Sequence, residues 1–216
     1  MRYKIIIFDL DGTLLDTRSD LASSLNMALS ANGVRTLERD TVISYVGNGA
    51  RKLVERAIAG TGREQDLPQI LEDYRNMYND NCVGATVPYD GVPELLDLLR
   101  HEDVIVCCNT NKPEFTSRKL LDALLPGKID YLHGQREGVP VKPDPSGVLA
   151  CLKEYGLGPD ECCYIGDSDV DIKTGHNAGV DVISVGWGFK TREFLVENGA
   201  GIICSNVKEL SCVLVS

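Results

Sequence analysis

Short apolar runs that end abruptly in polar residues recur along the chain, and patterns of helical period lie between them. The first run, residues 4–8, is rich in isoleucine and stops at Asp9, Asp11 and Gly12. Continuous apolar runs of this length are typical of parallel strands that are buried on both faces. Further runs of this kind cover residues 104–108, 130–133, 162–165, 181–185 and 201–204. Helical segments of about 10 to 15 residues separate most of them, so the pattern predicts right-handed crossovers and an α/β fold with a doubly wound parallel sheet.

The stretch between the first two runs has a different pattern. Leu21, Leu25 and Leu29 are four residues apart, as on one face of a helix, and Gly33 suits the end of that helix. Further helical segments are expected around residues 38–45, 50–59 and 66–82, with glycines between them. No strand is evident in this stretch. The sequence therefore predicts an α/β core made of residues 1–14 and 84–216, with an all-α segment, residues 15–83, inserted after the first strand.

In the core, prolines and glycines mark where helices begin and end. Pro93 and Pro113 suit the first turn of a helix, and each precedes regularly spaced leucines. Further helices are expected over residues 145–155, 168–178 and 206–214. His176 would then lie on a helix surface. Trp187, in a loop between two glycines, would either line a cleft or simply pack.

Composition and charge narrow the classes of function. The 216 residues are 43% apolar, enough for a substantial core, and the formal net charge is −10. This acidity argues against binding to nucleic acid or to an anionic membrane, since both depend on a basic surface. No apolar run approaches the roughly 20 residues of a membrane helix, and a strand pattern begins by Tyr3 without a preceding signal peptide. We therefore expect a cytoplasmic protein, a monomer or a homodimer, without nucleic-acid or membrane partners.

The eight cysteines do not form the pattern of a metal site. None shows the paired CxxC spacing that is typical of zinc sites, and several lie inside apolar runs. We therefore expect the cysteines to be reduced thiols in the core, and nothing in their spacing supports a catalytic or redox role.

Every polar cluster follows a predicted strand or begins a predicted helix. In a parallel sheet such positions share one edge, where ligands bind. The residues expected to converge there are Asp9, Asp11, Thr110, Lys142 and Asp167. Carboxylates are the hard oxygen ligands that Mg²⁺ takes, usually one or two together with water and substrate phosphate. Asp9 and Asp167 are therefore candidate metal ligands, and Asp171, one helical turn further on, would bind the metal directly or hold one of its waters.

The same residue types suit a phosphate group. Free amides where helices begin after Thr110 and Asp167 would favour an anion, while Thr110 adds a hydroxyl and Lys142 a positive charge. A cation and a lysine are needed because several aspartates and a phosphate dianion would otherwise repel one another. Asp9 could act as a nucleophile and form an acyl phosphate. Asp11 would then protonate the leaving oxygen and later activate water.

Each piece has a simpler structural explanation when it is taken alone. A DxDG sequence is an ordinary turn, and Thr110 with Asn111 would serve as a helix cap. Lys142 would be a solvated loop lysine, and the last two aspartates would interact with a helix dipole. The order of these pieces after successive strands favours the functional interpretation.

Together the segments resemble the haloacid dehalogenase superfamily of aspartate-nucleophile phosphotransferases over nearly the whole chain. Its four motifs correspond in order to residues 8–13 (FDLDGT), 109–112 (NTNK), 142–145 (KPDP) and 166–171 (GDSDVD). The resemblance implies a Rossmann-like core and a Mg²⁺ cofactor. It also implies two catalytic residues, Asp9 as the nucleophile and Asp11 as the acid and base.

The resemblance further implies which residues bind the metal and the phosphate. Asp9, the backbone carbonyl of Asp11, and Asp167 would hold the metal, and Asp171 matches a further acidic position of the last motif. The residues that would bind the phosphoryl oxygens are Thr110, Asn111 and Lys142.

The helical insertion is similar to the cap domain of the subfamily that includes phosphoglycolate phosphatase and β-phosphoglucomutase. Gly47, Asn48 and Gly49 resemble the cap loop of phosphoglycolate phosphatases and would bind a small carboxylate, with Arg51 as its partner. The alternative is a plain turn between helices with a surface arginine. Closure of the cap would exclude water during phosphorylation of the enzyme.

The sequence thus predicts a Mg²⁺-dependent phosphatase that acts on a small phosphorylated metabolite, with 2-phosphoglycolate as the leading candidate. A sugar phosphomutase of the same superfamily is the first alternative, because it would share the aspartyl phosphate. A regulatory module that binds metal and phosphate without catalysis is the second. The presence of Asp11 argues against the dehalogenase branch, which lacks that carboxylate.

Overall fold

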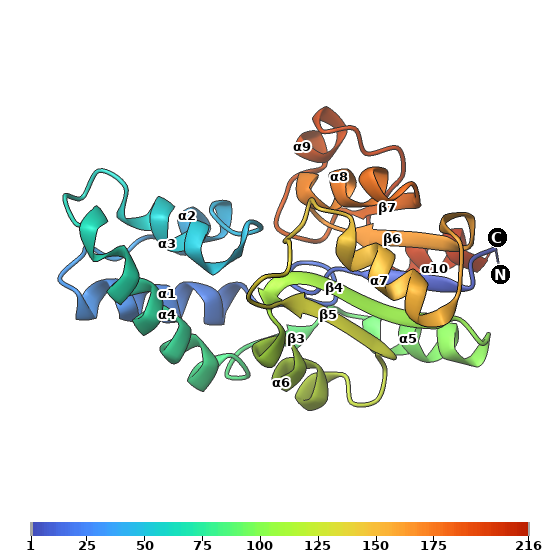
Figure 1. Ribbon diagram of the computed structural model, residues 1–216, viewed down its shortest axis with the longest axis horizontal. Helices are drawn as coiled ribbons and strands as arrows, with labels where there is room; N and C mark the ends of the chain where they lie inside the picture. Colours follow the sequence, from blue (N-terminus) through green and yellow to red (C-terminus); the bar gives the residue numbers. More distant parts are fainter. Residues whose placement is uncertain (1, 216) are drawn as a thin grey trace. The chain divides into compact units, whose positions relative to one another are not determined.

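The computed structural model describes residues 2–215, which form two compact units (Figure 1). The core unit contains the chain up to Asp16 and from Pro88 onward, and the helical unit is Thr17–Val87. The chain leaves the core unit after strand β2 (Leu15–Asp16) and returns in β3 (Val87–Pro88). These two short strands pair with each other where the chain passes between the units.

The core unit is built on a six-stranded sheet in which every neighbouring pair of strands is parallel. The strands are β1 (Ile5–Phe8), β4 (Ile105–Pro113), β5 (Tyr131–Gln135), β6 (Cys162–Gly166), β7 (Asp181–Val185) and β8 (Ile203–Cys204). Their order across the sheet is β5-β4-β1-β6-β7-β8. The chain continues from β1 to one side of the sheet and from β6 to the other. The carboxyl ends of β1 and β6 therefore flank a topological switch point, where open α/β sheets bind ligands.

Helices cover both faces of this sheet. They are α5 (Val92–His101), α6 (Glu114–Leu124), α7 (Ser146–Tyr155), α8 (Asp169–Ala178), α9 (Arg192–Glu197) and α10 (Val207–Val215). Ile5 and Ile7 of β1 belong to one buried cluster with Val148 of α7. The intervening Ile6 and Phe8 are just as buried, and because alternate residues of a strand point to opposite faces, the other face is covered too.

The helical unit contains four α-helices and one short 3₁₀-helix. They are α1 (Arg18–Ala31), α2 (Arg39–Ser44), α3 (Gly49–Ile58), η1 (Glu64–Asp66) and α4 (Leu67–Asn81). α1 packs along α4, and the leucines predicted to share one face of α1 are buried. The buried carboxylate of Asp20 accepts hydrogen bonds from the amides of Ala85 (2.9 Å) and Thr86 (2.8 Å) and from the Thr86 hydroxyl (2.7 Å). Asp20 thereby joins the first turn of α1 to the segment that returns to the core unit.

These elements confirm the predicted fold class. The six expected strands and the helices expected between them are all present, with bounds shifted by a few residues except at the end of β4. The pattern did not predict β2, β3, α9, η1 or η2 (Pro159–Glu161). All of these except α9 have only two or three residues, which is too few to show a period of apolar residues.

One local prediction is wrong. Strand β4 continues through Thr110 and Asn111 to Pro113, and α6 begins only at Glu114. Thr110 and Asn111 therefore do not cap a helix, and no helix begins directly after Thr110 to supply free amides there. Pro113 explains the difference, because a proline disfavours helical geometry in the residue that precedes it.

Predictions for single surface and core residues can also be compared with the structure. Seven of the eight cysteines are buried free thiols, as expected, but Cys212 is exposed on α10. His176 is exposed on α8, as predicted. Across residues 2–215, no helix combines the length and the apolar character needed to cross a membrane.

Candidate active site

Three buried carboxylates meet at the carboxyl ends of β1 and β6. Asp9 follows β1, Asp167 follows β6, and Asp171 lies in the first turn of α8. One oxygen of each carboxylate lies within 4.8 Å of an oxygen of the other two. The structure therefore brings these three candidate residues together at the switch point of the sheet.

Burial makes the ionised forms of these carboxylates costly. It raises the pKa of Asp9 to about 7 against the opposing charge of Lys142, and the negative charge of Asp171 adds to the rise. Burial, followed by the charges of Asp171 and Asp9, raises the pKa of Asp167 well above its ordinary value. A divalent cation stabilises carboxylates that would otherwise repel one another in such a place. The donor set therefore fits Mg²⁺, with Asp9 and Asp167 as the carboxylates that it would neutralise.

Asp167 is enclosed by the backbone of two glycines. A Cβ atom on Gly12 would lie 2.3 Å from Oδ2 of Asp167, and one on Gly188 would lie 2.3 Å from its Cβ. The amide of Phe189 donates a hydrogen bond to Oδ2 of Asp167 at 2.6 Å. A side chain at either glycine would displace the carboxylate, so the loops after β1 and β7 fix its place.

Lys142 lies between Asp9 and Asp171. Its Nζ is 2.8 Å from Oδ1 of Asp9 and 2.6 Å from Oδ1 of Asp171. Burial favours the neutral amine, but the two carboxylates outweigh it and hold the pKa of Lys142 well above its usual value. The side chain of Asn111 fixes the lysine, because its Oδ1 accepts from the Lys142 amide at 2.7 Å and its Nδ2 donates to the Lys142 carbonyl at 3.1 Å. The Asn111 amide group thus positions Lys142, and phosphate binding by Asn111 stays a prediction.

Asp171 accepts hydrogen bonds on both carboxylate oxygens. Oδ1 accepts from Nζ of Lys142 at 2.6 Å and from the Tyr164 hydroxyl at 3.3 Å. Oδ2 accepts from the Ser168 amide at 3.1 Å and from its hydroxyl at 2.6 Å. Ser168 and Asp171 thereby form the capping box at the start of α8. With these donors, Asp171 anchors Lys142, and its predicted role at the metal, as a ligand or through a water, stays a prediction.

Asp11 has a partner that the sequence pattern did not reveal. Nζ of Lys112 lies 2.7 Å from each of the two carboxylate oxygens of Asp11. Thr110 is also buried, and its hydroxyl accepts a hydrogen bond from the Lys112 amide at 3.2 Å. A lysine in the polar segment that follows the predicted strand 104–108 was a signal for Lys112. The direction of its side chain could not be read from the sequence.

Comparison with protein families finds a match over most of the chain. A model described as haloacid dehalogenase-like hydrolase matches residues 6–185. The chain belongs to the haloacid dehalogenase-like hydrolases. This match confirms the resemblance that the four sequence motifs indicate.

Several relatives of this haloacid dehalogenase-like hydrolase are named as phosphatases. A phosphoglycolate phosphatase of Aquifex aeolicus (strain VF5) is 35% identical over 187 residues, which cover 86% of each chain. An N-acetylmuramic acid 6-phosphate phosphatase of Pseudomonas aeruginosa is 30% identical and covers 99% of this chain and 96% of its own. A solved structure from Lactobacillus delbrueckii subsp. bulgaricus, provisionally named a phosphoglycolate phosphatase, has a TM-score of 0.94 at 34% identity over 99% of both chains. The chain is thus a phosphoric monoester hydrolase of the phosphoglycolate phosphatase-like kind.

In the helical unit of this haloacid dehalogenase-like hydrolase, the glycine loop before α3 is braced by an arginine that the sequence did not single out. Arg56 donates to the side-chain oxygen of Asn48 at 2.7 Å. Arg51 instead pairs with Glu55 at 3.0 Å on the surface of α3. Substrate recognition stays a prediction for the four residues Gly47, Asn48, Gly49 and Arg51.

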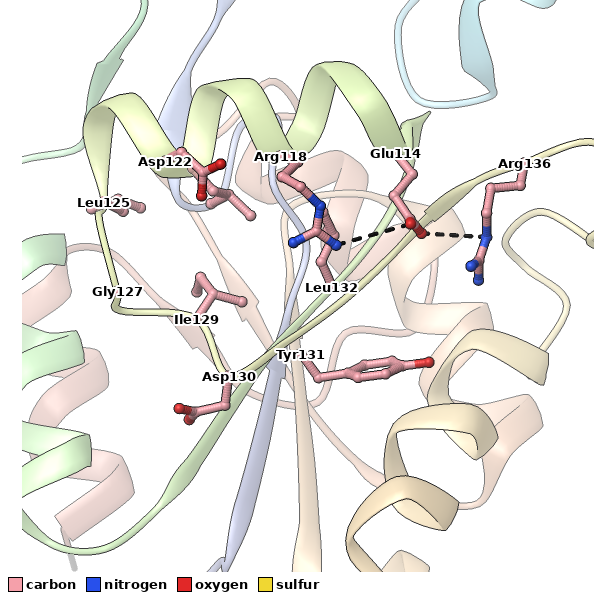
Figure 2. Close-up of a pocket in the computed structure, with 11 residues that line it drawn as sticks. Glu114, Arg118, Asp122, Leu125, Gly127, Ile129, Asp130, Tyr131, Leu132 and Arg136 are labelled. Carbon is pink, nitrogen blue, oxygen red and sulfur yellow. Dashed lines mark ion pairs between the residues drawn. The ribbon is translucent and has the colours of Figure 1, made fainter.

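A cavity of the haloacid dehalogenase-like core lies between α6 and β5. The cavity has a volume of about 310 Å³, and none of the predicted active-site residues lines it. Figure 2 shows Glu114 between Arg118 and Arg136, with ion pairs of 3.9 Å and 3.3 Å. Asp122 and Asp130 also line the cavity. With three acids against two arginines, the cavity has no excess positive charge to attract a phosphate.

Trp187 packs against the loop of the first motif. Its indole Nε1 donates a hydrogen bond to the carbonyl oxygen of Thr13 at 3.1 Å. Its ring centroid lies 6.4 Å from that of Tyr89. Trp187 therefore supports the segment that carries Asp9 and Asp11 in this haloacid dehalogenase-like hydrolase.

Proposed function

We propose that this hydrolase is a Mg²⁺-dependent phosphatase that acts on a small phosphorylated metabolite through an aspartyl phosphate on Asp9. The proposal rests on Lys142, 2.8 Å from Asp9 and 2.6 Å from Asp171, in a group of carboxylates that includes Asp167. Asp9 is a buried carboxylate at the switch point of the sheet, it is paired with a lysine, and a second candidate metal ligand lies next to it. This arrangement suits nucleophilic attack on a phosphoryl group. Mg²⁺, held by Asp9, Asp167 and the backbone carbonyl of Asp11, would supply positive charge against the phosphate oxygens.

In the first half-reaction, Asp9 is the nucleophile. One of its carboxylate oxygens forms a bond to phosphorus while the bond between phosphorus and the ester oxygen breaks. Asp11 gives its proton to that oxygen, so the alcohol leaves in its neutral form and Asp11 becomes a carboxylate. Thr110 and Lys142 hold the phosphoryl oxygens during this step.

In the second half-reaction, water attacks the phosphorus atom of the aspartyl phosphate. Asp11 takes one proton from this water, the bond between phosphorus and the Asp9 oxygen breaks, and hydrogen phosphate leaves. Asp9 returns to the carboxylate and Asp11 to the acid, so the site is ready for the next cycle.

2-Phosphoglycolate is the substrate that we propose first, because relatives along most of the chain carry the name phosphoglycolate phosphatase. We also propose that residues 15–83 act as a cap over the core, residues 1–14 and 84–216. In this scheme the substrate carboxylate binds to the loop residues Gly47, Asn48, Gly49 and Arg51. N-Acetylmuramic acid 6-phosphate is the substrate to compare with it, since it appears in the name of one relative.

Release of inorganic phosphate from 2-phosphoglycolate tests the proposal. We expect steady turnover with Mg²⁺, loss of turnover in EDTA, and recovery when Mg²⁺ is restored. Asp9→Asn should lower turnover by about a thousandfold or more, because the nucleophile is lost. Asp169→Asn is the matched control, since Asp169 pairs at the surface with Lys173 at 2.7 Å. It should stay within about twofold of wild type.

Two outcomes would contradict the proposal. If no phosphate ester in a panel with both named substrates turns over above the Asp9→Asn level, the chain is not a phosphatase. If phosphoryl groups move between positions of a sugar phosphate without steady release of inorganic phosphate, the enzyme is a phosphomutase.

A further inference from the structure

Lys112 is a buried lysine for which the proposed mechanism has no role. It is the residue of β4 directly before Pro113, and only 3% of its side chain is exposed. Its Nζ is 2.7 Å from each oxygen of the Asp11 carboxylate, whose side chain is 14% exposed. A buried ammonium group is costly unless it is paired, so this contact differs from the ion pairs of exposed lysines.

The geometry of this pair restricts Asp11. One ammonium group that contacts both oxygens fixes the position and the rotation of the carboxyl group. The backbone of Lys112 is also held, because its N–H donates a hydrogen bond to the Thr110 hydroxyl at 3.2 Å. The short segment from Thr110 to Lys112 therefore connects a proposed phosphate ligand to the proposed proton carrier.

We propose that Lys112 is a positioning residue for proton transfer by Asp11. The inference rests on the proposed function and concerns its first half-reaction. As the bond between phosphorus and the ester oxygen breaks, its electron pair goes to that oxygen, and the proton of the Asp11 carboxyl group joins it. Asp11 is left with a negative charge. The ammonium group of Lys112, already in contact with both carboxylate oxygens, stabilises this charge.

Two substrates with different leaving groups test this role. 2-Phosphoglycolate needs a proton on its leaving oxygen, whereas 4-nitrophenolate leaves from 4-nitrophenyl phosphate without one. In Lys112→Met, kcat/KM for 2-phosphoglycolate should fall about 100-fold, as expected for a weakened general acid. kcat/KM for 4-nitrophenyl phosphate should fall less than about fivefold. An equal fall for both substrates would overturn the proposal, since it would indicate a general disturbance of the site.

Further variants separate positioning from structural support. The quantity to compare is the kcat/KM for 2-phosphoglycolate divided by the kcat/KM for 4-nitrophenyl phosphate. Lys112→Arg keeps a cation, so this ratio should lie between those of wild type and Lys112→Met. In an Asp11→Asn background, Lys112→Met should change that ratio no further, because Lys112 acts through Asp11. A further change of the ratio in this background would contradict the proposal. Lys173→Met, which removes an exposed pair with Asp169, is the matched control and should leave the ratio unchanged.

The design also distinguishes failure of this inference from failure of the proposed function. If circular dichroism shows that Lys112→Met does not fold, Lys112→Gln is used in its place. It should lower kcat/KM for 2-phosphoglycolate much more than kcat/KM for 4-nitrophenyl phosphate. If Asp9→Asn keeps its turnover, the proposed function itself is wrong. If Asp9→Asn is inactive but the Lys112 variants lower kcat/KM equally for both substrates, only the role of Lys112 is wrong.

Discussion

The aspartates of the site differ in how their negative charge is balanced. Asp171 accepts four hydrogen bonds, and Asp11 is paired with a buried lysine. Asp9 shares its lysine with Asp171, and Asp167 accepts a hydrogen bond from a backbone amide. Burial raises the pKa of both Asp9 and Asp167. The demand for additional positive charge is therefore concentrated on Asp9 and Asp167.

Asp167→Asn should stabilise the protein when Mg²⁺ is absent. The folded pKa of Asp167 is raised well above its value in the unfolded chain, which loses this proton near pH 4. Between these two pKa values the folded state binds more protons than the unfolded state, so the stability of wild type falls as the pH rises. Asparagine has no such proton and still offers an oxygen to the Phe189 amide. At pH 8 we expect a gain of about 1–2 kcal/mol in the free energy of unfolding.

Denaturant titrations in EDTA and in Mg²⁺ measure this effect. Wild type should be less stable than Asp167→Asn in EDTA and should gain stability when Mg²⁺ is added, because the proposed site would bind the ion only in the folded state. The variant should gain little. A variant that is less stable than wild type in EDTA would show that the carboxylates do not strain the fold.

Some site residues could be predicted from the sequence, whereas others depend on the direction of a side chain. Asp9 and Asp167 each follow a buried strand, and the ends of neighbouring parallel strands meet. Tyr164 lies inside an apolar run, and nothing in that run indicates that its hydroxyl contacts Asp171. Lys112, which contacts Asp11, lies in the part of β4 where the pairing with β5 shifts, between Asn109 and Pro113. The order of apolar and polar residues along the chain does not show in which direction a side chain points.

At the scale of helices and strands, most of the predicted elements are long enough to show a period, although β8 has two residues and α2 has six. β1 and β6 are continuous apolar runs, and α7 and α8 are followed by Gly156 and Gly179 in left-handed conformation. By contrast, β2 and β3 have two residues each and α9 has six. Pairing and packing with other parts of the fold, rather than local sequence, define these short elements.

The start of α8 allows a prediction at this scale. Ser168→Ala removes the N-cap hydroxyl and should lower the free energy of unfolding by about 1 kcal/mol. Asp171 would also lose the 2.6 Å hydrogen bond from that hydroxyl, so Lys142 would be held less firmly. We expect turnover to fall by about 3- to 10-fold, equivalent to one lost hydrogen bond.

Thr191→Ala is the matched control for this cap. The Thr191 hydroxyl accepts from the Phe194 amide at 3.2 Å at the start of α9, so its loss should cost similar stability. None of the carboxylates of the site depends on it. If both variants lower turnover equally, the effect of Ser168→Ala reflects lower stability rather than the position of Asp171.

At the scale of the whole molecule, the chain passes between its two units twice, through β2 and β3. Asp20 holds the two ends of the helical unit together at these passages, with hydrogen bonds of 2.7–3.0 Å to Ala85 and Thr86. Asp20→Ala leaves two backbone amides and one hydroxyl without their acceptor. We expect it to lower the free energy of unfolding by about 2–4 kcal/mol.

Thermal and denaturant unfolding followed by circular dichroism measure this loss. Asp40→Ala is the control, because the Asp40 side chain is 96% exposed and its charge interacts weakly. It should change the free energy of unfolding by less than about 0.5 kcal/mol. An equally small effect of Asp20→Ala would show that the two ends of the helical unit are held by other contacts.

The position of Trp187 has a practical consequence. It is the single tryptophan of the 216-residue chain, and its indole N–H is bound to Thr13, at the end of the motif that contains Asp9 and Asp11. Its ring lies beside Tyr89, which belongs to the segment that returns from the helical unit. Indole emission responds to changes in the surrounding polarity and hydrogen bonding. The unmodified protein therefore carries one intrinsic fluorophore against the loop of Asp9 and Asp11. If Mg²⁺ or a phosphate ester binds there as proposed, a change in indole emission would report it without a label.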